Sequence, residues 1–397
     1  ITSMIKEKYN IAVFSFAYSP FEGGAEIAAR EVMRRLKNFN FSVFTYKFER
    51  SWLSKETQDN VEIIRLGGGS RKKKKYGRIT AKIFYILQAW QEAERLHQQK
   101  RFDAIWVIMA SYGGIAALFF KLSHPKIPML LTIQEGDSEQ HMVFGKFGLV
   151  GFWARQIIKK ADYIQAISSY LKDFVFKRGA HVPIEVIPNG VDLDLFDTSY
   201  KDSEKKALRE NLGIKDDYVI VTTSRLVWKN GVDILIDAVA KLKEKRSNIK
   251  CLIIGDGPEL HRLKAQSSKL KANNYVIFLG QIPQRDLPLY LKISDIFVRP
   301  SRSEGLGSSF LEAMASGLPV IGTPVGGIAD FLRDEETGIF VKPEDPEDLA
   351  KKIFMLLGNS DLKKRIISNA KILTHQSYSW ETIAILFKNI FDKLINL

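Results

Sequence analysis

Short apolar runs alternate with longer amphipathic stretches along the whole chain. The apolar runs, such as residues 11–17 and 104–109, predict buried strands. The longer stretches carry apolar residues at helical spacing, most regularly at 232–245. Strands separated by helices form parallel sheets that helices cover on both faces, so the pattern predicts an α/β fold.

The alternation occurs twice, on either side of a turn-rich and charged stretch at 188–217. In the first half the pattern predicts strands at 11–17, 41–46, 61–66, 104–109, 129–133, 163–167 and 184–187, and helices at 25–37, 79–99, 115–122, 153–160 and 169–178. In the second half it predicts strands at 218–223, 250–254, 276–279, 296–298, 320–322 and 338–341, and helices at 232–245, 259–270, 287–292, 310–316 and 328–332, with two closing helices at 346–358 and 380–397.

This order predicts two doubly wound, Rossmann-like domains. We expect the first at residues 1–190 and the second at 191–379, facing each other across a cleft. In sheets of this kind, ligands bind beyond the carboxyl ends of the strands. Candidate site residues are therefore expected in the loops that follow the strands.

Composition narrows the class of protein. The 397 residues are 45% hydrophobic and 26% charged, which excludes a disordered or collagen-like chain. The single cysteine, Cys251, excludes an internal disulfide and favours a reducing compartment. No apolar run approaches the roughly 18 residues that span a bilayer, and the first residues lack the design of a secretory signal. We therefore expect a soluble or membrane-peripheral cytoplasmic protein.

The net charge of +14 points to anionic partners. The densest basic run is Arg-Lys-Lys-Lys-Lys at 71–75, which suits an anionic lipid surface or phosphorylated substrates and is equally consistent with a solvated loop. No zinc-ligand spacing, RNP-like aromatic strand or basic heptad helix accompanies the run. We therefore expect no nucleic-acid partner.

Loops after the predicted strands carry glycines and cations. Gly23 and Gly24 follow the first strand and would let a ligand approach the backbone at a helix N-terminus, unless they only form a tight turn. Arg225 and Lys229 follow the first strand of the second half, where a guanidinium fork and an ammonium group suit a diphosphate. Gly257, in a Gly-Asp-Gly-Pro turn, indicates a close backbone approach or an ordinary turn.

The block at 300–319 is the most specific feature of the sequence. Its loop carries Glu304, which can accept hydrogen bonds from sugar hydroxyls, and glycines whose N–H groups can hold phosphate. A helix then begins, and Glu312 in its first turn can bind a diol such as a ribose. Ser309 and Glu312 also have the spacing of a capping box, whereas Glu304 has no structural role to explain it. The glycine loop at 323–327 can add amides to the same site.

In order along the chain, these motifs resemble glycosyltransferase family 4, which has the GT-B fold. The motifs are Gly23-Gly24, Asn-Gly-Val-Asp at 189–192, Arg225 with Lys229, Gly-Asp-Gly-Pro at 255–258, the Glu304-x7-Glu312 pair, and Thr-Pro-Val-Gly-Gly at 323–327. The resemblance covers nearly the whole chain. It implies transfer of a sugar from a nucleoside diphosphate to an acceptor with retention of anomeric configuration, and no prosthetic group.

The resemblance also implies roles for individual residues. The second domain would bind the donor, and Arg225, Lys229 and Glu304 would form the catalytic set. The implied donor-binding residues are Gly23, Gly24, Gly257, Gln281, Ile282, Gly305, Leu306, Gly307, Ser308 and Glu312. No metal site is expected, because preorganised cations and amides can stabilise the departing diphosphate. The last helix, 380–397, would pack back on the first, acceptor-side domain.

One departure from the family concerns the acceptor side. Related enzymes often carry a His directly after the strand that is here 129–133, whereas this chain has Gln134, followed by Glu135 and Asp137. Gln134 can form hydrogen bonds but cannot titrate, which puts a proton role in doubt. These three residues are the acceptor-side candidates, and the alternative is that they are ordinary polar loop residues.

The apolar segment 142–153, with Lys159 and Lys160 after it and the 71–75 run, suits docking on an anionic inner leaflet. The alternative is a core-facing helix with a basic loop. We expect a UDP- or GDP-linked hexose donor and an acceptor such as a lipid-linked or cell-envelope glycan. Rival interpretations are a nucleotide-sugar epimerase, a glycogen-type synthase or phosphorylase, and a non-catalytic nucleotide-sugar binding protein.

Overall fold

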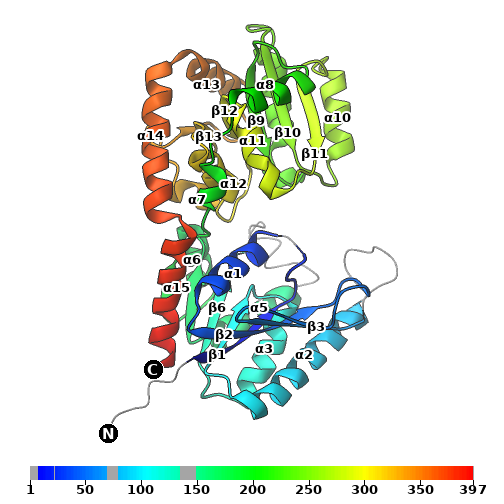
Figure 1. Cartoon of the computed structure of the whole chain (residues 1–397), viewed down its shortest axis with the longest axis vertical. Helices are drawn as coiled ribbons and strands as arrows, with labels where there is room; N and C mark the ends of the chain where they lie inside the picture. The colour runs from blue at the N-terminus through cyan, green and yellow to red at the C-terminus, as the bar shows by residue number, and fades with distance from the viewer. Residues whose placement is uncertain (1–7, 22, 69–78, 135–148, 397) are drawn as a thin grey trace. The chain divides into compact units, whose positions relative to one another are not determined.

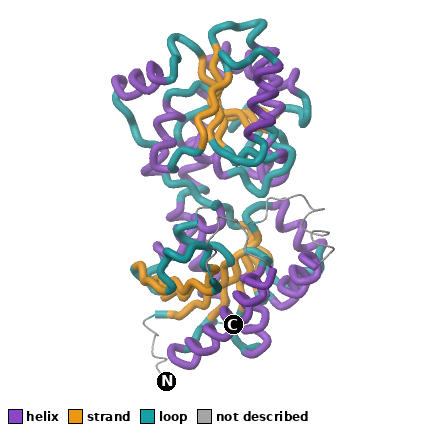
Figure 2. Tube along the Cα trace, turned by 90° about the vertical axis from the view of Figure 1, so that its right-hand side faces the viewer, coloured by secondary structure: helices purple, strands orange, loops and turns teal. Residues whose placement is uncertain are grey.

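The computed structural model describes residues 8–21, 23–68, 79–134 and 149–396. The chain divides into two compact units, Ile1–Asn189 with Trp380–Leu397, and Gly190–Ser379 (Figure 1). In each unit, helices surround a central sheet (Figure 2). The predicted α/β fold with two Rossmann-like sheets is therefore confirmed. Within the described ranges, no helix is long and apolar enough to cross a membrane.

The sheet of the first unit has eight strands among the described residues, in the order β3-β4-β2-β1-β5-β6-β7-β8. All neighbours are parallel except β3 and β4. In this register Tyr9 pairs with Phe39, and Ile11 pairs with Ala104. The strands are β1 (Tyr9–Ser15), β2 (Phe39–Tyr46), β3 (Lys55–Gln58), β4 (Val61–Leu66), β5 (Ala104–Ile108), β6 (Met129–Ile133), β7 (Tyr163–Ala166) and β8 (Ile184–Val186).

Helices cover both faces of this sheet because its strands are apolar on both sides. Val13 is buried with residues of α1 and α15 on one face, whereas the ring of Phe14 lies 6.1 Å from that of Phe120 on α3 at the other. Helices α2 and α5 contact α3. The helices are α1 (Gly24–Arg35), α2 (Ile79–Lys100), α3 (Tyr112–Ser123), α5 (Leu149–Lys160), α6 (Ser169–Lys177) and α15 (Trp380–Ile395).

The sheet of the second unit has six parallel strands among the described residues, in the order β11-β10-β9-β12-β13-β14. The strand order reverses between β9 and β12, where Ile220 pairs with Ile296. The strands are β9 (Tyr218–Thr223), β10 (Ile249–Ile254), β11 (Val276–Gly280), β12 (Ile296–Arg299), β13 (Val320–Gly322) and β14 (Ile339–Phe340).

The second sheet is also covered on both faces. Val298 is buried with residues of α9, α10, α13 and α14, whereas the ring of Phe297 lies 5.1 Å from that of Phe310 on α12. The helices are α7 (Leu193–Phe196), α8 (Asp202–Asn211), α9 (Val232–Leu242), α10 (Leu260–Lys269), α11 (Leu287–Lys292), α12 (Ser308–Ala315), α13 (Pro346–Gly358) and α14 (Ser360–Ser377), with 3-10 turns η1 (Trp228–Asn230), η2 (Gln284–Asp286) and η3 (Gly326–Asp330).

Among the described residues, the sequence-based expectations lack the strand β3 and the helices α7, α8 and α14, besides the short 3-10 turns η1 and η2. β3 is a polar strand at the sheet edge, α7 is a single turn, and α8 buries none of its residues, so none of the three has a clear apolar period. α14 does bury Leu362, Ile366 and Ala370 at helical spacing. The expectation that only two helices close the chain is therefore wrong.

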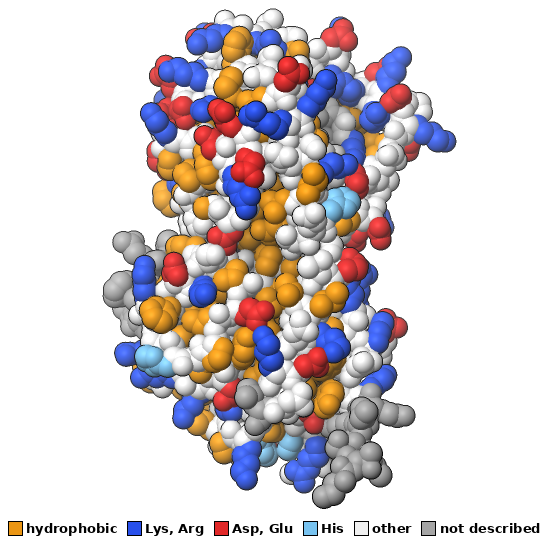
Figure 3. Space-filling view, turned by 90° about the vertical axis from the view of Figure 1, so that its left-hand side faces the viewer, with side chains coloured by type: hydrophobic (Ala, Val, Ile, Leu, Met, Phe, Trp, Pro, Cys, Tyr) orange, Lys and Arg blue, Asp and Glu red, His pale blue; other side chains and the backbone are white. Residues whose placement is uncertain are grey.

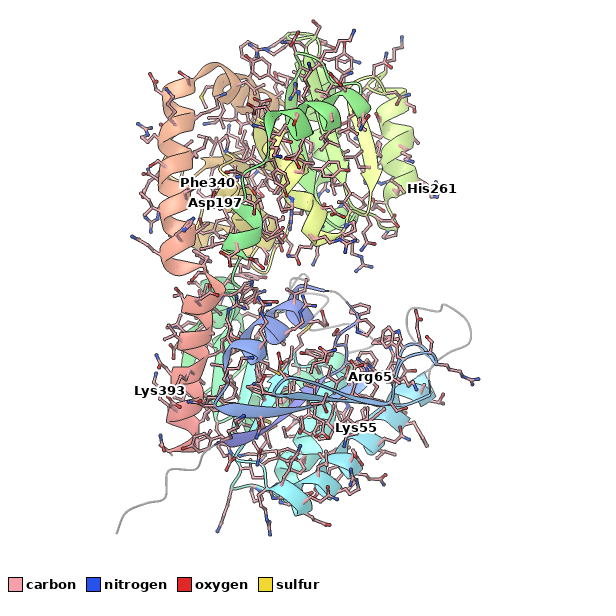
Figure 4. All side chains as sticks on the ribbon, viewed as in Figure 1. Lys55, Arg65, Asp197, His261, Phe340 and Lys393 are labelled. Atoms are coloured by element: carbon pink, nitrogen blue, oxygen red, sulfur yellow. The ribbon has the colours of Figure 1, made fainter. Side chains whose placement is uncertain are left out.

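Charged side chains are dispersed over the face drawn in Figure 3, where Lys and Arg lie among Asp and Glu. Several charged side chains of the described residues are paired, such as Lys371 with Asp197 at 2.6 Å and Lys393 with Glu185 at 3.4 Å (Figure 4 labels Asp197 and Lys393). The basic run at 71–75 lies outside the described residues, so its predicted role stays a prediction.

Candidate active site

In the second unit, the loops at the carboxyl ends of the strands follow the strand order. Because that order reverses between β9 and β12, the loops after these two strands flank the position where open α/β sheets bind ligands. Arg225 and Lys229 lie in the loop after β9, and Glu304 lies in the loop after β12. The motifs that the sequence singles out therefore come together at one edge of one sheet.

Neighbouring loops at this edge are joined backbone to backbone. The hydrogen bonds that join them are Gly255 N–H to Gly280 O (2.7 Å), Leu226 N–H to Asp256 O (3.0 Å), Arg302 N–H to Lys229 O (2.7 Å) and Gly327 N–H to Glu304 O (3.2 Å). The loops after β11, β10, β9, β12 and β13 thus form one connected row. We call it the donor edge, after the role that the sequence analysis predicts for it.

Glycines make this row possible. A Cβ on Gly255 would lie 1.8 Å from the carbonyl oxygen of Ser224, and one on Gly326 would lie 1.8 Å from that of Glu304. A Cβ on Gly257 would lie 2.2 Å from Leu226 O. The structure therefore explains why glycine occupies these positions: each lies too close to a neighbouring loop to carry a side chain. The donor-binding role of Gly257 stays a prediction.

Glu304 has a buried ionic partner that the sequence analysis missed. Arg299, the last residue of β12, forms an ion pair with Glu304 and donates to Ser309 Oγ at 2.6 Å and to Ser301 Oγ at 3.1 Å. Burial lowers the pKa of Arg299 to about 10, against the opposing charge of Glu312. The expectation that Glu304 has no structural role is therefore wrong. The sequence does contain a signal for this partner, which is an arginine at the end of an otherwise apolar strand.

Glu312 is not part of a capping box. α12 begins at Ser308 with Gly307 as its N-cap and no capping side chain, so Glu312 lies in the second turn and not the first. Gln284 Nε2 donates to Glu312 Oε1 at 3.2 Å. Burial raises the pKa of Glu312 to about 7, although Gln284 and Arg299 oppose the shift. Its carboxyl group therefore titrates near neutral pH.

The loop after β9 combines cations with polar groups. Arg225 is exposed and Lys229, in η1, is partly exposed. Asn230 Nδ2 donates to Arg225 O at 2.6 Å, which fixes the turn between the two cations. Hydroxyls of Thr222, Thr223 and Ser224 are buried without a hydrogen-bond partner in the part of the chain that the structure describes. Donors are thus available close to Arg225.

In the first unit the strand order reverses between β1 and β5, and aromatic rings gather there. The rings of Phe16, after β1, and Tyr112, which begins α3, lie 5.2 Å apart. Lys82 Nζ lies 4.7 Å from the centroid of Tyr112. Arg65, labelled in Figure 4, holds the loop after β1 by donating to Ser19 O at 2.6 Å. We call these rings the aromatic edge: Phe16, Phe21, Tyr46, Phe48, Trp52, Tyr85 and Tyr112.

The predicted residues of the first unit lie in loops after β1 and β6. Gly23 is the N-cap of α1 and Gly24 its first residue, as expected. A Cβ on Gly23 would lie 2.3 Å from Glu26 Oε2, so the Glu26 carboxyl group lies over the helix N-terminus. Gln134 Oε1 accepts from Asn189 Nδ2 at 3.2 Å. The other acceptor-side candidates, Glu135 and Asp137, lie outside the described residues.

Two family models match the chain, and together they cover most of it. The model described as Glycosyltransferase Family 4 matches residues 22–195. The model described as Glycosyl transferases group 1 matches residues 204–373. The chain belongs to glycosyltransferase family 4.

Curated relatives of this family 4 chain include proteins of known and unknown activity. An uncharacterised glycosyltransferase of Methanocaldococcus jannaschii is 34% identical over 51% of this chain and 52% of its own length. A GDP-mannose-dependent alpha-(1-6)-phosphatidylinositol monomannoside mannosyltransferase of Mycolicibacterium smegmatis is 33% identical over 52% and 55%. An alpha-monoglucosyldiacylglycerol synthase of Streptococcus pneumoniae is 25% identical over 90% and 80%. The match thus spans about half the length of the first two relatives.

Solved structures of other glycosyltransferases share the fold of the family 4 chain. A sucrose-phosphate synthase from Thermosynechococcus elongatus has a TM-score of 0.82 and 21% identity, covering 98% of this chain and 100% of that chain. HepE of Anabaena, in complex with UDP-glucose, has a TM-score of 0.77 and 20% identity, covering 97% and 99%. The predicted GT-B fold is therefore confirmed.

Most of the site residues predicted for this family 4 chain lie at the donor edge of the second unit. Leu306 is only 2% exposed, so its backbone and not its side chain can meet a ligand. Gln281 and Ile282 follow β11 at the far end of the row. The predicted residues at this edge are Arg225, Lys229, Gly257, Gln281, Ile282, Glu304, Gly305, Leu306, Gly307, Ser308 and Glu312. In the described ranges no group of three or more His, Cys, Asp or Glu is placed to hold a metal ion.

Proposed function

We propose that this chain is a retaining hexosyltransferase. It moves a hexose from a UDP- or GDP-linked donor to a lipid-linked or cell-envelope glycan acceptor. The observation that carries the proposal is the donor edge, where backbone hydrogen bonds join the loop of Arg225 and Lys229 to the loop of Glu304. Cations for a diphosphate and a carboxylate for sugar hydroxyls therefore occupy adjacent loops at the strand-order reversal.

The chemistry of transfer suits this edge. Breaking the anomeric bond puts negative charge on the departing diphosphate, which Arg225, Lys229 and the uncapped N–H groups of α12 can stabilise. The hydroxyl of Ser224, which has no hydrogen-bond partner among the described residues, can donate to a phosphoryl oxygen. Glu304 is assigned to the hydroxyls of the transferred sugar and Glu312 to the ribose. We infer that these groups replace a resident metal ion, and activity is expected to persist in excess EDTA.

The names of the relatives support a hexose donor and a lipid acceptor. One relative transfers mannose from GDP-mannose to a phosphatidylinositol mannoside, and another is named as a synthase of a glucosyldiacylglycerol. HepE is a structural neighbour that binds UDP-glucose. We keep UDP and GDP as alternatives, and ligand binding distinguishes them.

The test is thermal stability of the full chain with UDP, GDP, ADP and CMP, and then with the matching nucleotide sugars. A ligand at about 100 times its dissociation constant adds about 2.7 kcal/mol to the free energy of unfolding. We expect an increase in Tm with one nucleoside diphosphate, and the anomeric proton of the product should show retention by NMR. No increase with any of the four would contradict the donor site and favour a protein that does not bind nucleotide sugars.

Rival activities give different products from the same donor. A nucleotide-sugar epimerase would interconvert the donor without an acceptor, whereas a transferase releases nucleoside diphosphate in proportion to the acceptor added. A non-catalytic binding protein would raise its Tm with the donor and release nothing. Donor turnover with and without added glycolipid therefore separates the three.

We also propose that the first unit docks on the anionic cytoplasmic leaflet of a membrane. Phe152 on α5 is 54% exposed, and Lys159 and Lys160 are exposed at the end of the same helix. On α2, the apolar side chains of Ile83, Phe84 and Leu87 are exposed. Exposed apolar side chains next to cations suit an anionic headgroup layer.

Sedimentation with liposomes tests this docking. We expect binding to anionic vesicles at low salt and release at high salt. Phe152→Ser with Phe84→Ser should weaken binding, whereas Phe354→Ser, at an exposed apolar residue of the second unit, should not. Equal sedimentation with neutral vesicles would remove the electrostatic part of the proposal.

A further inference from the structure

Arg302 lies in the loop after β12, two residues before Glu304, and every donor of its guanidinium has an acceptor. Nη1 donates to Trp228 O and Asp233 Oδ1, both at 2.8 Å. Nη2 donates to Asp233 Oδ2 at 3.0 Å and to Glu344 Oε2 at 2.9 Å, and Nε donates to Glu344 Oε1. These bonds use all five N–H donors of an arginine.

The acceptors of Arg302 come from three separate segments. Trp228 belongs to η1, Asp233 to the first turn of α9, and Glu344 to the turn before α13. Arg302 Cζ also lies 4.7 Å from the centroid of the Trp228 ring. Only 10% of the Arg302 side chain is exposed. The side chain is therefore held from several directions.

The backbone of the same loop forms hydrogen bonds to Lys229, the residue after Trp228. The N–H groups of Arg302 and Ser303 both point to Lys229 O, at 2.7 Å and 3.4 Å. The loop that presents Lys229 is thus fixed at two consecutive carbonyl groups. The Arg302 side chain binds Trp228 O, and the Arg302 backbone binds Lys229 O. The loop that presents Glu304 supplies all of these donors.

We infer that Arg302 is a positioning residue that fixes the spacing between Lys229 and Glu304. The inference rests on the proposed function, in which the first of these meets the diphosphate and the second meets the sugar. Asp233 and Glu344 add two carboxylates next to a site for a diphosphate, and Arg302 neutralises charge there while it joins the loops. Lysine would keep the charge, but its point-like ammonium group cannot reproduce the planar fork that reaches all three segments.

The test compares Arg302→Lys with Arg262→Leu. Arg262 is a matched control, because it reaches the same Asp233 carboxylate at 3.7 Å and pairs at 2.6 Å with Glu259, the N-cap residue of its own helix. The first readout is the dissociation constant of UDP and GDP by calorimetry. The second is amide hydrogen exchange of residues 301–304. We expect nucleotide affinity to fall about 10-fold or more in Arg302→Lys, with faster exchange, and to change less than about twofold in Arg262→Leu.

Each outcome separates this inference from the proposed function. Unchanged affinity in Arg302→Lys overturns the positioning role, whether or not exchange rises, because a purely structural contact would change exchange alone. Wild-type protein that binds neither nucleotide contradicts the proposed function. If the wild-type protein binds neither nucleotide, unchanged amide exchange in Arg302→Lys also overturns the inference. Faster exchange would then support only the statement that Arg302 joins the two loops.

Discussion

The two sheets carry different chemistry at their carboxyl ends. At the donor edge of the second unit, the loops are joined by backbone hydrogen bonds and glycine contacts, and the charged groups there include Arg299 at the end of β12 and Glu304 in the loop after it. At the aromatic edge of the first unit, rings such as Phe16 and Tyr112 contact one another. Fixed polar groups suit a reaction that separates charge, whereas aromatic faces suit the apolar surface of a sugar ring or lipid. The difference favours donor chemistry in the second unit and acceptor binding in the first.

The largest expected effect comes from Glu304. Glu304→Gln should lower the transfer rate about 10²–10³-fold, because it removes the carboxylate assigned to the sugar. Alanine is the poorer choice, because it leaves the buried guanidinium of Arg299 without its partner, at a cost of about 3–5 kcal/mol. The measurements are kcat and Tm of the same samples.

A double variant separates structure from catalysis at this pair. Arg299→Leu with Glu304→Leu should recover most of the Tm lost by Glu304→Leu alone, because replacing a whole buried ion pair by apolar groups is often neutral. It should recover no activity. Transfer at the wild-type rate in Glu304→Gln would show that the site assignment is wrong.

The next largest effects are expected from glycine substitutions, which should change stability in the second unit but not in the first. Gly255 has a φ of 135° and a Cβ there would lie 1.8 Å from a backbone oxygen, so Gly255→Ala should lower the free energy of unfolding by about 3 kcal/mol or more. Gly24 has nothing within 4 Å of a Cβ, so Gly24→Ala should leave Tm unchanged and lower activity only if a substrate approaches there. Denaturant unfolding with parallel rate measurements checks both.

The expected ligand at Gly24 follows from its neighbour. The Glu26 carboxyl group lies over the N-terminus of α1. An anion at this helix end would face that carboxylate, so we expect an acceptor hydroxyl there and not a phosphate. A higher acceptor KM with an unchanged donor KM in Gly24→Ala would support this, and the reverse would contradict it.

The sequence predicted the fold well because its strands are apolar and its helices amphipathic. It also identified the loops of the donor edge, since glycines and charged residues after a strand are local signals. It missed α8, which buries no residue, and the partners of Glu304 and Lys229, because an ion pair such as Arg299 with Glu304 depends on how a strand end meets a loop. The capping interpretation of Ser309 failed for the same reason, since Arg299 binds that hydroxyl.

A moderate change in the free energy of unfolding with pH is expected from Glu312 at the donor edge. Burial raises the pKa of Glu312 from 4.5 to about 7. Between these values the folded state keeps a proton that the unfolded state has lost, so the free energy of unfolding falls as pH rises through this window. Glu312→Gln should remove this fall, on the order of 1–3 kcal/mol, as measured by denaturant unfolding at pH 5 and pH 8. Equal pH dependence in both proteins would contradict the shift.

The smallest effect is expected from Gln134, at the first unit's edge. Its amide cannot titrate, and its Oε1 accepts from Asn189 Nδ2 at 3.2 Å, so it acts by hydrogen bonding alone. Gln134→Ala should lower kcat/KM less than about tenfold, the loss of one neutral hydrogen bond. The pH profile of kcat/KM should keep its wild-type midpoint, because the Gln134 amide does not titrate. A profile that loses its midpoint in Gln134→Ala, while Glu312→Gln retains it, would place the titrating group in the first unit.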